Sequence, residues 1–101
     1  MEVTLGAKVL SPPTFFRGTH GVHETFDAVC NDGSAFDGAH FAVVDNVDIA
    51  PRIAVRSGDD IEVHGEWVKD AGRPPIVHWT HRDPHGRHED GYIKWGGRVY
   101  A

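Results

Sequence analysis

The stretch that decides the fold is Ser57-Gly58-Asp59-Asp60-Ile61-Glu62-Val63-His64-Gly65. It opens with a Ser-Gly-Asp turn and continues as an alternation of apolar and polar residues, which is the pattern of a half-buried β-strand. Trp67 keeps the same phase, so we expect one strand over residues 60–68. Gly65 interrupts that strand, and a mid-strand glycine permits the bend that a small barrel requires. The stretch therefore favours a strongly curved sheet.

Further segments on both sides of this stretch have the character of short strands. They cover residues 3–10, 23–30, 39–47 and 76–81, and a C-terminal pair, 92–95 and 98–100, flanks Gly96-Gly97. The intervening segments, 11–21, 48–52 and 70–74, read as loops, and Asn31-Asp32-Gly33 is a strong turn signal. Gly-Gly between two short strands indicates a hairpin. We expect at least five strands and no helix longer than about three turns.

An all-β chain of 101 residues has to close or cover the edges of its sheet. A small, partly open barrel and a compact sandwich are the economical solutions. Because of the bent central strand, we predict an OB-like barrel of five to six strands with a C-terminal hairpin. The length fits a single domain over residues 1–101.

Composition narrows the classes of function. The net charge of −5 counts against duplex nucleic-acid binding, which usually requires a basic face, but it leaves room for a small anionic ligand. No apolar run approaches the roughly 20 residues of a membrane span, and MEVTLGAKVL lacks a basic leader, so we expect a cytoplasmic protein. Cys30 is the single cysteine, which rules out an internal disulfide, and its phase with Phe26 and Ala28 predicts a buried position.

The densest chemistry lies in residues 78–92, His-Trp-Thr-His-Arg-Asp-Pro-His-Gly-Arg-His-Glu-Asp-Gly-Tyr. Four of the eight histidines fall within this run, mixed with two arginines and three carboxylates. Imidazole titrates near neutral pH and binds transition metals, and arginine presents a fork that fits phosphate or carboxylate. The run therefore predicts a polar site without specifying a reaction.

A divalent metal is one candidate ligand of this run. Three histidines stand at i, i+4 and i+7: His81, His85 and His88. Pro84 and Gly86 disfavour a helix here, so a turn would have to gather the histidines, with Asp83 as a further ligand. The spacing matches no familiar zinc pattern, and we favour loop histidines without a metal.

A metal-free acid–base site is the second candidate. Phosphodiester hydrolysis requires a base, an acid and cations that stabilise the developing charge. We assign His23, His78 and His81 as the candidate acid–base residues. The candidate ligand-binding residues are Asn46, Asp48, Arg52, Asp83, Arg87 and His88. We expect Arg52 to lie within hydrogen-bonding reach of residues 78–88, which would bring the 46–52 loop and the histidine run to one mouth of the barrel.

A purely structural polar network is the alternative. In that interpretation Asp83 accepts N–H groups of its own turn, Arg52 pairs with Asp48 or Asp83, and the protein is a non-catalytic interaction module. In both interpretations Asp83 is expected to be buried and hydrogen-bonded. His78 and His81 lie three apart on the expected strand, so they should point to opposite faces unless a bulge intervenes.

The aromatic residues admit two roles. Stacking of bases on exposed rings would indicate single-strand nucleic-acid binding, but the acidic balance counts against it. We expect Trp67 and Trp79 to pack in the core and Phe15-Phe16 to plug one barrel end, with a partner contact as the alternative for the two phenylalanines. Trp95 and Tyr100 are expected to cover an edge.

Several of these motifs resemble a small bacterial family, domain of unknown function 3465. The matching elements are His23 and Phe26, Asn46, Asp48, Ala50-Pro51-Arg52, Gly58-Asp59, Gly65-Glu66, His78-Trp79-Thr80-His81, Asp83-Pro84, Gly86, His88 and Gly91-Tyr92. The resemblance spans about residues 23–100. Asp45 departs from it, because many relatives have histidine there, and many relatives also carry an export signal. The family implies no activity, so the residues alone lead us to predict a cleft that binds a small anionic, phosphate-bearing or nucleotide ligand, with hydrolysis of that ligand as an extension.

Overall fold

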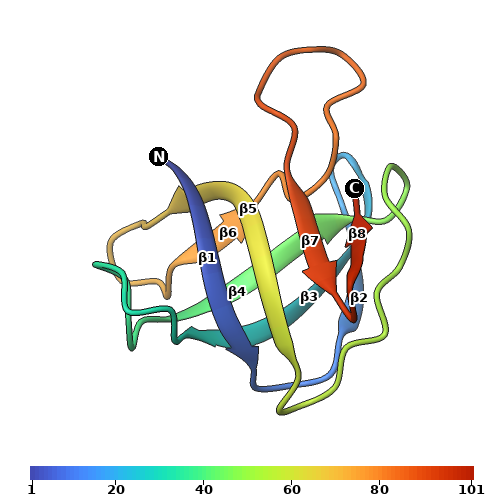
Figure 1. Cartoon of the computed structure of the whole chain (residues 1–101). Coiled ribbons are helices and arrows are strands. Elements are labelled where there is room, and N and C mark those ends of the chain that lie inside the picture. The colour runs from blue at the N-terminus through green and yellow to red at the C-terminus, as the bar shows by residue number, and fades with distance from the viewer.

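A computed structural model describes residues 1–101 as an all-β protein (Figure 1). Its eight strands are β1 (Glu2–Val9), β2 (Thr14–Gly18), β3 (Gly21–Cys30), β4 (His40–Asn46), β5 (Asp60–Val68), β6 (Ile76–His78), β7 (Tyr92–Trp95) and β8 (Arg98–Tyr100). The prediction of at least five strands and no long helix is confirmed. No helix of the chain is long and apolar enough to cross a membrane.

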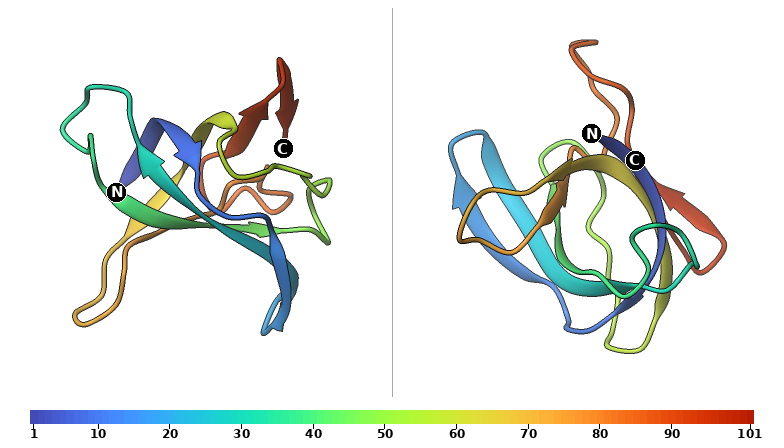
Figure 2. Two further views of the ribbon diagram at one scale, coloured as in Figure 1. Left: turned by 90° about the horizontal axis from the view of Figure 1, so that it is seen from below. Right: turned by 90° about the vertical axis from the view of Figure 1, so that its left-hand side faces the viewer.

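Five of the strands close into a barrel (Figure 2). Their order is β1-β3-β4-β6-β5, and β5 returns to pair with β1. All neighbours are antiparallel except β4 and β6, which run parallel. The β7–β8 hairpin extends from β5, and β2 pairs with β3 outside the closed ring. The predicted OB-like barrel with a C-terminal hairpin is thus confirmed.

Inward-facing residues of the alternating strands fill the barrel, together with Ile53 and Val55 from the segment between β4 and β5. Fifteen buried apolar side chains form one core cluster: Val3, Leu5, Ala7, Val9, Phe26, Ala28, Cys30, Phe41, Val43, Ile53, Val55, Ile61, Val63, Val77 and Ile93. Cys30 is buried, as expected from its phase. Burial of each larger aliphatic side chain stabilises the fold by about 1.5–3 kcal/mol. The core therefore holds the barrel wall on which the polar site is built.

Gly65 allows β5 to approach the end of β6 closely. A Cβ atom added at Gly65 would lie 2.5 Å from the carbonyl oxygen of His78 and 3.0 Å from Cγ2 of Thr80. No larger residue fits there without moving the backbone. The glycine that interrupts the alternation is therefore needed where the chain leaves the barrel wall after His78.

The first loop differs from its prediction. Residues 14–18, expected to be loop, form β2, an edge strand that pairs along β3. Phe15 and Phe16 lie on it with exposed fractions of 49% and 46%, so they do not plug the barrel. Instead, Phe16 stacks on the His23 ring at 5.2 Å. The alternating signal failed here because both faces of this short strand are accessible to solvent.

Not all of the tryptophans lie where the sequence predicted. Trp67 packs against the core, with its ring 4.7 Å from that of Phe36, as predicted. Trp95 and Tyr100 also pack against the core from the terminal hairpin. Trp79 was expected in the core but is 41% exposed. Its φ angle of 56° ends the strand at His78, three residues earlier than predicted, and begins the 79–91 loop that stands above the barrel in Figure 1.

Candidate functional site

A cleft of about 690 Å³ lies where the 79–91 loop meets β3 and β4. The histidines that line it are His20, His23, His78, His81, His85 and His88. These are six of the eight histidines of the chain. Asn46, Asp83 and Arg87 also line the cleft. Seven of the nine predicted site residues are therefore gathered in one place, and the other two, Asp48 and Arg52, are not among its lining residues.

Register and backbone geometry bring these side chains together. His23 on β3 pairs with Asn46 on β4, so both side chains point to the outer face of the barrel. The left-handed conformation of Trp79 reverses the alternation of the expected strand. As a result His78 and His81, which an uninterrupted strand would place on opposite faces, both line the cleft.

Asp83 holds the tight turn within the 79–91 loop. Its carboxylate accepts backbone N–H groups of His85 at 2.9 Å, of His88 at 2.6 Å and of Arg87. The side chain is 5% exposed, so the expectation of a buried, hydrogen-bonded carboxylate is confirmed. Burial alone would raise the pKa of Asp83, but the three backbone N–H groups outweigh it and hold that pKa below its usual value.

An aromatic stack forms one wall of the cleft. The Trp79 ring lies nearly parallel to the rings of His78 and His88, with centroids 4.7 Å and 4.4 Å away. His81 meets His88 edge to face at 5.7 Å. The stack fixes the imidazole planes without using their ring nitrogens for contacts with one another.

Backbone carbonyls fix the tautomers of three cleft histidines. Nδ1 lies 3.1 Å from the Gly21 oxygen in His23, 2.6 Å from the Arg82 oxygen in His81, and 2.8 Å from the Glu89 oxygen in His88. A carbonyl only accepts, so Nδ1 carries the proton in each ring. Nε2 is then a lone-pair acceptor in the neutral ring and an N–H donor in the protonated ring.

Burial tunes two of the histidines. His81 is 6% exposed, and desolvation is the main cause that lowers its pKa, while its bond to the Arg82 carbonyl acts in the opposite direction. Desolvation also lowers the pKa of His78, against the attraction of Glu66. Both rings therefore favour the neutral form at pH 7, which is the form required of a general base.

Asn46 and Asp48 position the β2–β3 turn. Asn46 donates through Nδ2 to the His20 carbonyl at 3.1 Å, and its Oδ1 accepts the Asp48 N–H at 3.0 Å. Asp48 in turn accepts the Val22 N–H at 3.0 Å. The two residues thus hold the backbone that carries His20 and His23.

The expected contact of Arg52 with residues 78–88 is wrong. The Arg52 guanidinium lies over the Phe15 ring, 4.9 Å from its centroid. Arg82 makes the connection between the two segments instead, donating to the Ile49 carbonyl at 2.9 Å. Sequence reasoning missed this residue because Arg82 and Arg52 offer the same donors, and which one reaches across depends on the path of the 79–91 loop.

Two buried carboxyl groups lie beneath the cleft and were not predicted. Glu24 and Asp45 are fully buried and face each other in register across β3 and β4. Glu24 accepts the Ile53 N–H at 2.9 Å, and Asp45 accepts the Thr80 hydroxyl at 3.1 Å. One oxygen of each has no hydrogen-bond partner. The alternation of each strand could have predicted their burial, because Glu24 points to the same face as Phe26 and Asp45 points to the same face as Val43.

The fold and the site together define a small OB-like barrel with a histidine-rich cleft over its second and third barrel strands. The chain belongs to the family described as "Protein of unknown function (DUF3465)", whose model matches residues 34–101, and the resemblance seen in the sequence is confirmed. Comparisons with curated proteins and with solved structures give no match.

Proposed function

We propose that the cleft binds a small phosphate-bearing ligand of the nucleotide class. The observation that carries the proposal is the hydrogen bonding of Asp83. Its carboxylate already accepts three backbone N–H groups of its own loop. The other groups that can carry charge in the lining are six imidazoles and the Arg87 guanidinium. Imidazolium and guanidinium donors are suited to phosphate oxygens.

The tautomers of the cleft histidines support anion binding that depends on pH. In His23, His81 and His88 the Nδ1 proton is held by a backbone carbonyl, so an added proton goes to Nε2. An anion stabilises that protonated form, and ligand binding should therefore take up protons. We expect affinity for phosphate to increase as the pH falls from about 8 to about 6.

The aromatic wall supports a ligand with a base attached to the phosphate. The His78, Trp79 and His88 rings present one stacked unit beside the cationic groups. OB-fold barrels use their second and third strands for ligands, and β3 and β4 are those strands here.

A hydrolytic role follows from one specific observation, the environment of His81. The ring is buried, its Nδ1–H is anchored on the Arg82 carbonyl, and its lowered pKa leaves Nε2 unprotonated at neutral pH. In this extension His81 takes a proton from the attacking water, and a protonated His23 gives a proton to the leaving oxygen. Arg87 stabilises the charge on the phosphoryl oxygens.

Calorimetry with inorganic phosphate and with adenosine 5′-monophosphate at pH 6 and pH 8 tests binding. We expect binding that strengthens at the lower pH, is weakened about tenfold by Arg87→Ala or His88→Gln, and is unchanged by Arg56→Ala or His40→Gln, two exposed positions that do not line the cleft. Absence of binding to both probes at pH 6, with a folded protein, would favour the interaction module.

Hydrolysis is tested separately with bis(p-nitrophenyl) phosphate. A turnover that requires His81 and persists in His40→Gln supports the extension. A protein that binds adenosine 5′-monophosphate but releases no nitrophenol restricts the function to binding.

A further inference from the structure

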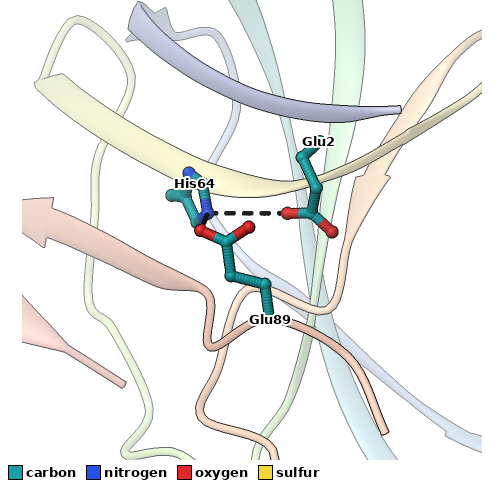
Figure 3. A group of neighbouring side chains, drawn as sticks. All are labelled: Glu2, His64 and Glu89. Carbon is teal, nitrogen blue, oxygen red and sulfur yellow. Dashed lines mark hydrogen bonds and ion pairs between the residues drawn. The ribbon is translucent and has the colours of Figure 1, made fainter.

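A second constellation of chemically active side chains lies outside the cleft. Glu2 on β1, His64 on β5 and Glu89 in the 79–91 loop offer one ligand atom each, and these atoms all lie within 4.8 Å of one another (Figure 3). It is the one such group of three or more among the histidines, cysteine and carboxylates of the chain. His81, His85 and His88 do not form a group of this kind, so the grouping considered from the sequence is not present.

The distances fit a first coordination shell. Nε2 of His64 lies 3.1 Å from Oε1 of Glu89 and 3.5 Å from Oε2 of Glu2. Two ligands that are each about 2.1 Å from a metal, at angles of about 90–110°, lie about 3.0–3.4 Å apart. The two distances to Nε2 are therefore close to those of a shared coordination shell, and the two carboxylate oxygens lie within 4.8 Å of each other.

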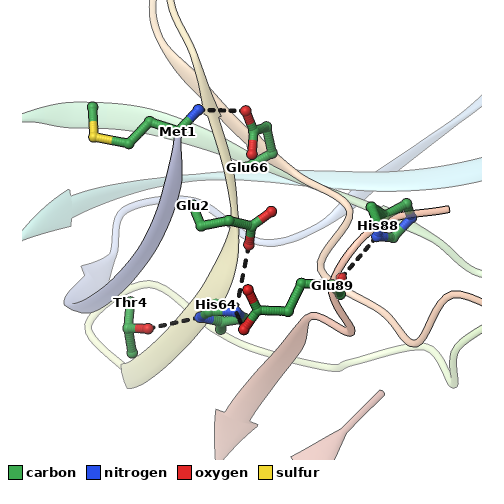
Figure 4. Close-up of polar contacts among 7 residues, drawn as sticks. All are labelled: Met1, Glu2, Thr4, His64, Glu66, His88 and Glu89. Carbon is green, nitrogen blue, oxygen red and sulfur yellow. Dashed lines mark hydrogen bonds and ion pairs between the residues drawn. The ribbon is translucent and has the colours of Figure 1, made fainter. Parts of the chain in front are cut away.

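A residue outside this group aims the imidazole. Nδ1 of His64 lies 2.7 Å from the hydroxyl of Thr4, as Figure 4 shows. Without an ion, Nε2–H donates to Glu89 at 3.1 Å and the Thr4 hydroxyl donates to Nδ1. When an ion takes the Nε2 lone pair, the ring proton moves to Nδ1, where the Thr4 hydroxyl can accept it. Histidines that ligate metals have their other ring nitrogen held in this way. The His64 side chain is 14% exposed and its ring stacks on that of Tyr92 at 5.5 Å, so its orientation is fixed.

Local charge also favours a cation. Glu66 lies beside Glu2 and is bound by the amino group of Met1 (Figure 4). Glu2 and Glu89 both face the His64 imidazole, and the repulsion between these two carboxylates is relieved by a bound cation.

We propose that Glu2, His64 and Glu89 form a binding site for a divalent transition-metal ion of the Zn²⁺ class, with water completing the coordination. A nitrogen ligand beside two carboxylates suits Zn²⁺ better than Mg²⁺ or Ca²⁺, which prefer oxygen ligands alone. The proposal does not rest on the phosphate-bearing ligand, and the two can fail independently.

Such an ion would connect the barrel wall to the cleft. It ties β1 and β5 to Glu89, whose carbonyl accepts the Nδ1–H of His88, a residue of the aromatic wall. Metal binding is therefore expected to order the C-terminal part of the 79–91 loop. Metal binding can therefore be followed both at the three ligands and at residues of the 79–91 loop.

Zinc chloride titrated into the chelator-treated chain at pH 7.5 tests the proposal by calorimetry. We expect one site whose affinity falls at least about tenfold in Glu2→Gln and in Glu89→Gln, which keep the shape and remove the charge. Asp70→Asn and His40→Gln, exposed positions that belong neither to this group nor to the cleft, should bind as the parent does. Thr4→Val should weaken binding about tenfold or more through His64, an effect that general charge attraction would not produce.

NMR amide spectra locate the ion because the cleft histidines compete for zinc. The first equivalent of Zn²⁺ should shift Thr4, His64 and Glu89 before it shifts His23 or His81, and an equal amount of Mg²⁺ should shift none of them. The proposal is overturned if the first equivalent goes to the cleft, if the two glutamine variants bind zinc as the parent does, or if the parent binds no zinc at about 0.1 mM.

Discussion

Glu24 and Asp45 face each other across β3 and β4 inside the barrel, and each retains a carboxyl oxygen without a hydrogen-bond partner. Desolvation, opposed by the Thr80 hydroxyl and reinforced by Glu24, raises the pKa of Asp45 to about 7. Desolvation also raises the pKa of Glu24. The fold is therefore more stable while this pair is protonated, and its free energy of unfolding decreases when the protons leave.

The first prediction concerns stability as a function of pH. Asp45 holds a proton in the folded state that the unfolded chain releases above about pH 4. The stabilisation linked to it is complete below about pH 4 and is lost as the pH rises through about 7. It amounts to a free energy on the order of 4 kcal/mol. Asp45→Asn, which has no proton to lose, should lack this loss of the free energy of unfolding between about pH 4 and pH 7.

Urea unfolding of the parent and Asp45→Asn between pH 4 and pH 8 measures the effect. The difference between the two curves is the informative quantity, because the lowered pKa values of His78 and His81 give the parent an opposite slope near pH 6.5. Asp70→Asn serves as the exposed control. Parallel curves for the parent and Asp45→Asn would show that Asp45 is ionised in the fold.

The second prediction concerns the turn held by Asp83. Asp83→Ala removes the acceptor of three backbone N–H groups, so amide exchange at His85, Arg87 and His88 should accelerate and the melting temperature should fall. Because the pKa of Asp83 is lowered, its stabilisation is present above about pH 4 and is lost as the pH falls through the folded-state pKa. Asp90→Ala, which removes one bond to the Asp83 N–H, is a milder comparison. Unchanged exchange in Asp83→Ala would contradict the assigned role.

The strands could be predicted where local pattern and pairing agree. Residues 60–68 and the hairpin around Gly96-Gly97 match the structure because alternation and turn residues specify both bounds. β2 was missed because its phenylalanines are exposed, and only its pairing with β3 makes it a strand. The predicted strand over 76–81 was too long because the reversal at Trp79 depends on packing of the 79–91 loop rather than on local propensity.

The sequence could predict which residue types form the candidate site, but not which side chains contact one another there. His78, His81 and Asp83 were selected because imidazole and carboxylate groups cluster in the sequence, and the cleft gathers them. Nothing local distinguishes Arg82, which spans to Ile49, from Arg52, which lies on Phe15. The group of Glu2, His64 and Glu89 could not be predicted from the sequence, because its members come from three segments that only the closed barrel brings together.

The third prediction separates backbone strain from stacking at Trp79. A φ of 56° is costly for a bulky residue and easy for glycine. Trp79→Ala and Trp79→Gly both lose the stack on His78 and His88, but only the glycine relieves the backbone. Trp79→Gly should therefore be more stable than Trp79→Ala by about 1 kcal/mol in urea unfolding.

At a position with an ordinary backbone conformation the alanine variant is the more stable of the two, and Val99 provides the comparison. Val99 is exposed on β8 in an ordinary extended conformation, so Val99→Ala should be more stable than Val99→Gly. The same order at both positions would show that Trp79 is not held in the left-handed region in solution.

The last prediction concerns Gly91, where the 79–91 loop rejoins the barrel. A Cβ atom at Gly91 would lie 1.9 Å from the Trp79 oxygen, 2.7 Å from the His64 oxygen and 2.9 Å from the Thr80 Cα, all of them backbone atoms that cannot rotate away. Its N–H also donates to the His81 carbonyl at 2.9 Å, so the loop closes on this residue. Gly91→Ala should cost about 3 kcal/mol or more. Gly72→Ala is the matched control: its φ of 76° carries the left-handed penalty of about 1–2 kcal/mol, and a Cβ there meets nothing within 4 Å. Urea unfolding and amide spectra of both variants measure the difference, and we expect shifts at His81 and His88 in Gly91→Ala alone. If Gly91→Ala is as stable as Gly72→Ala, the close contact between the ends of the loop does not exist, and the cleft that depends on it would have to be redrawn.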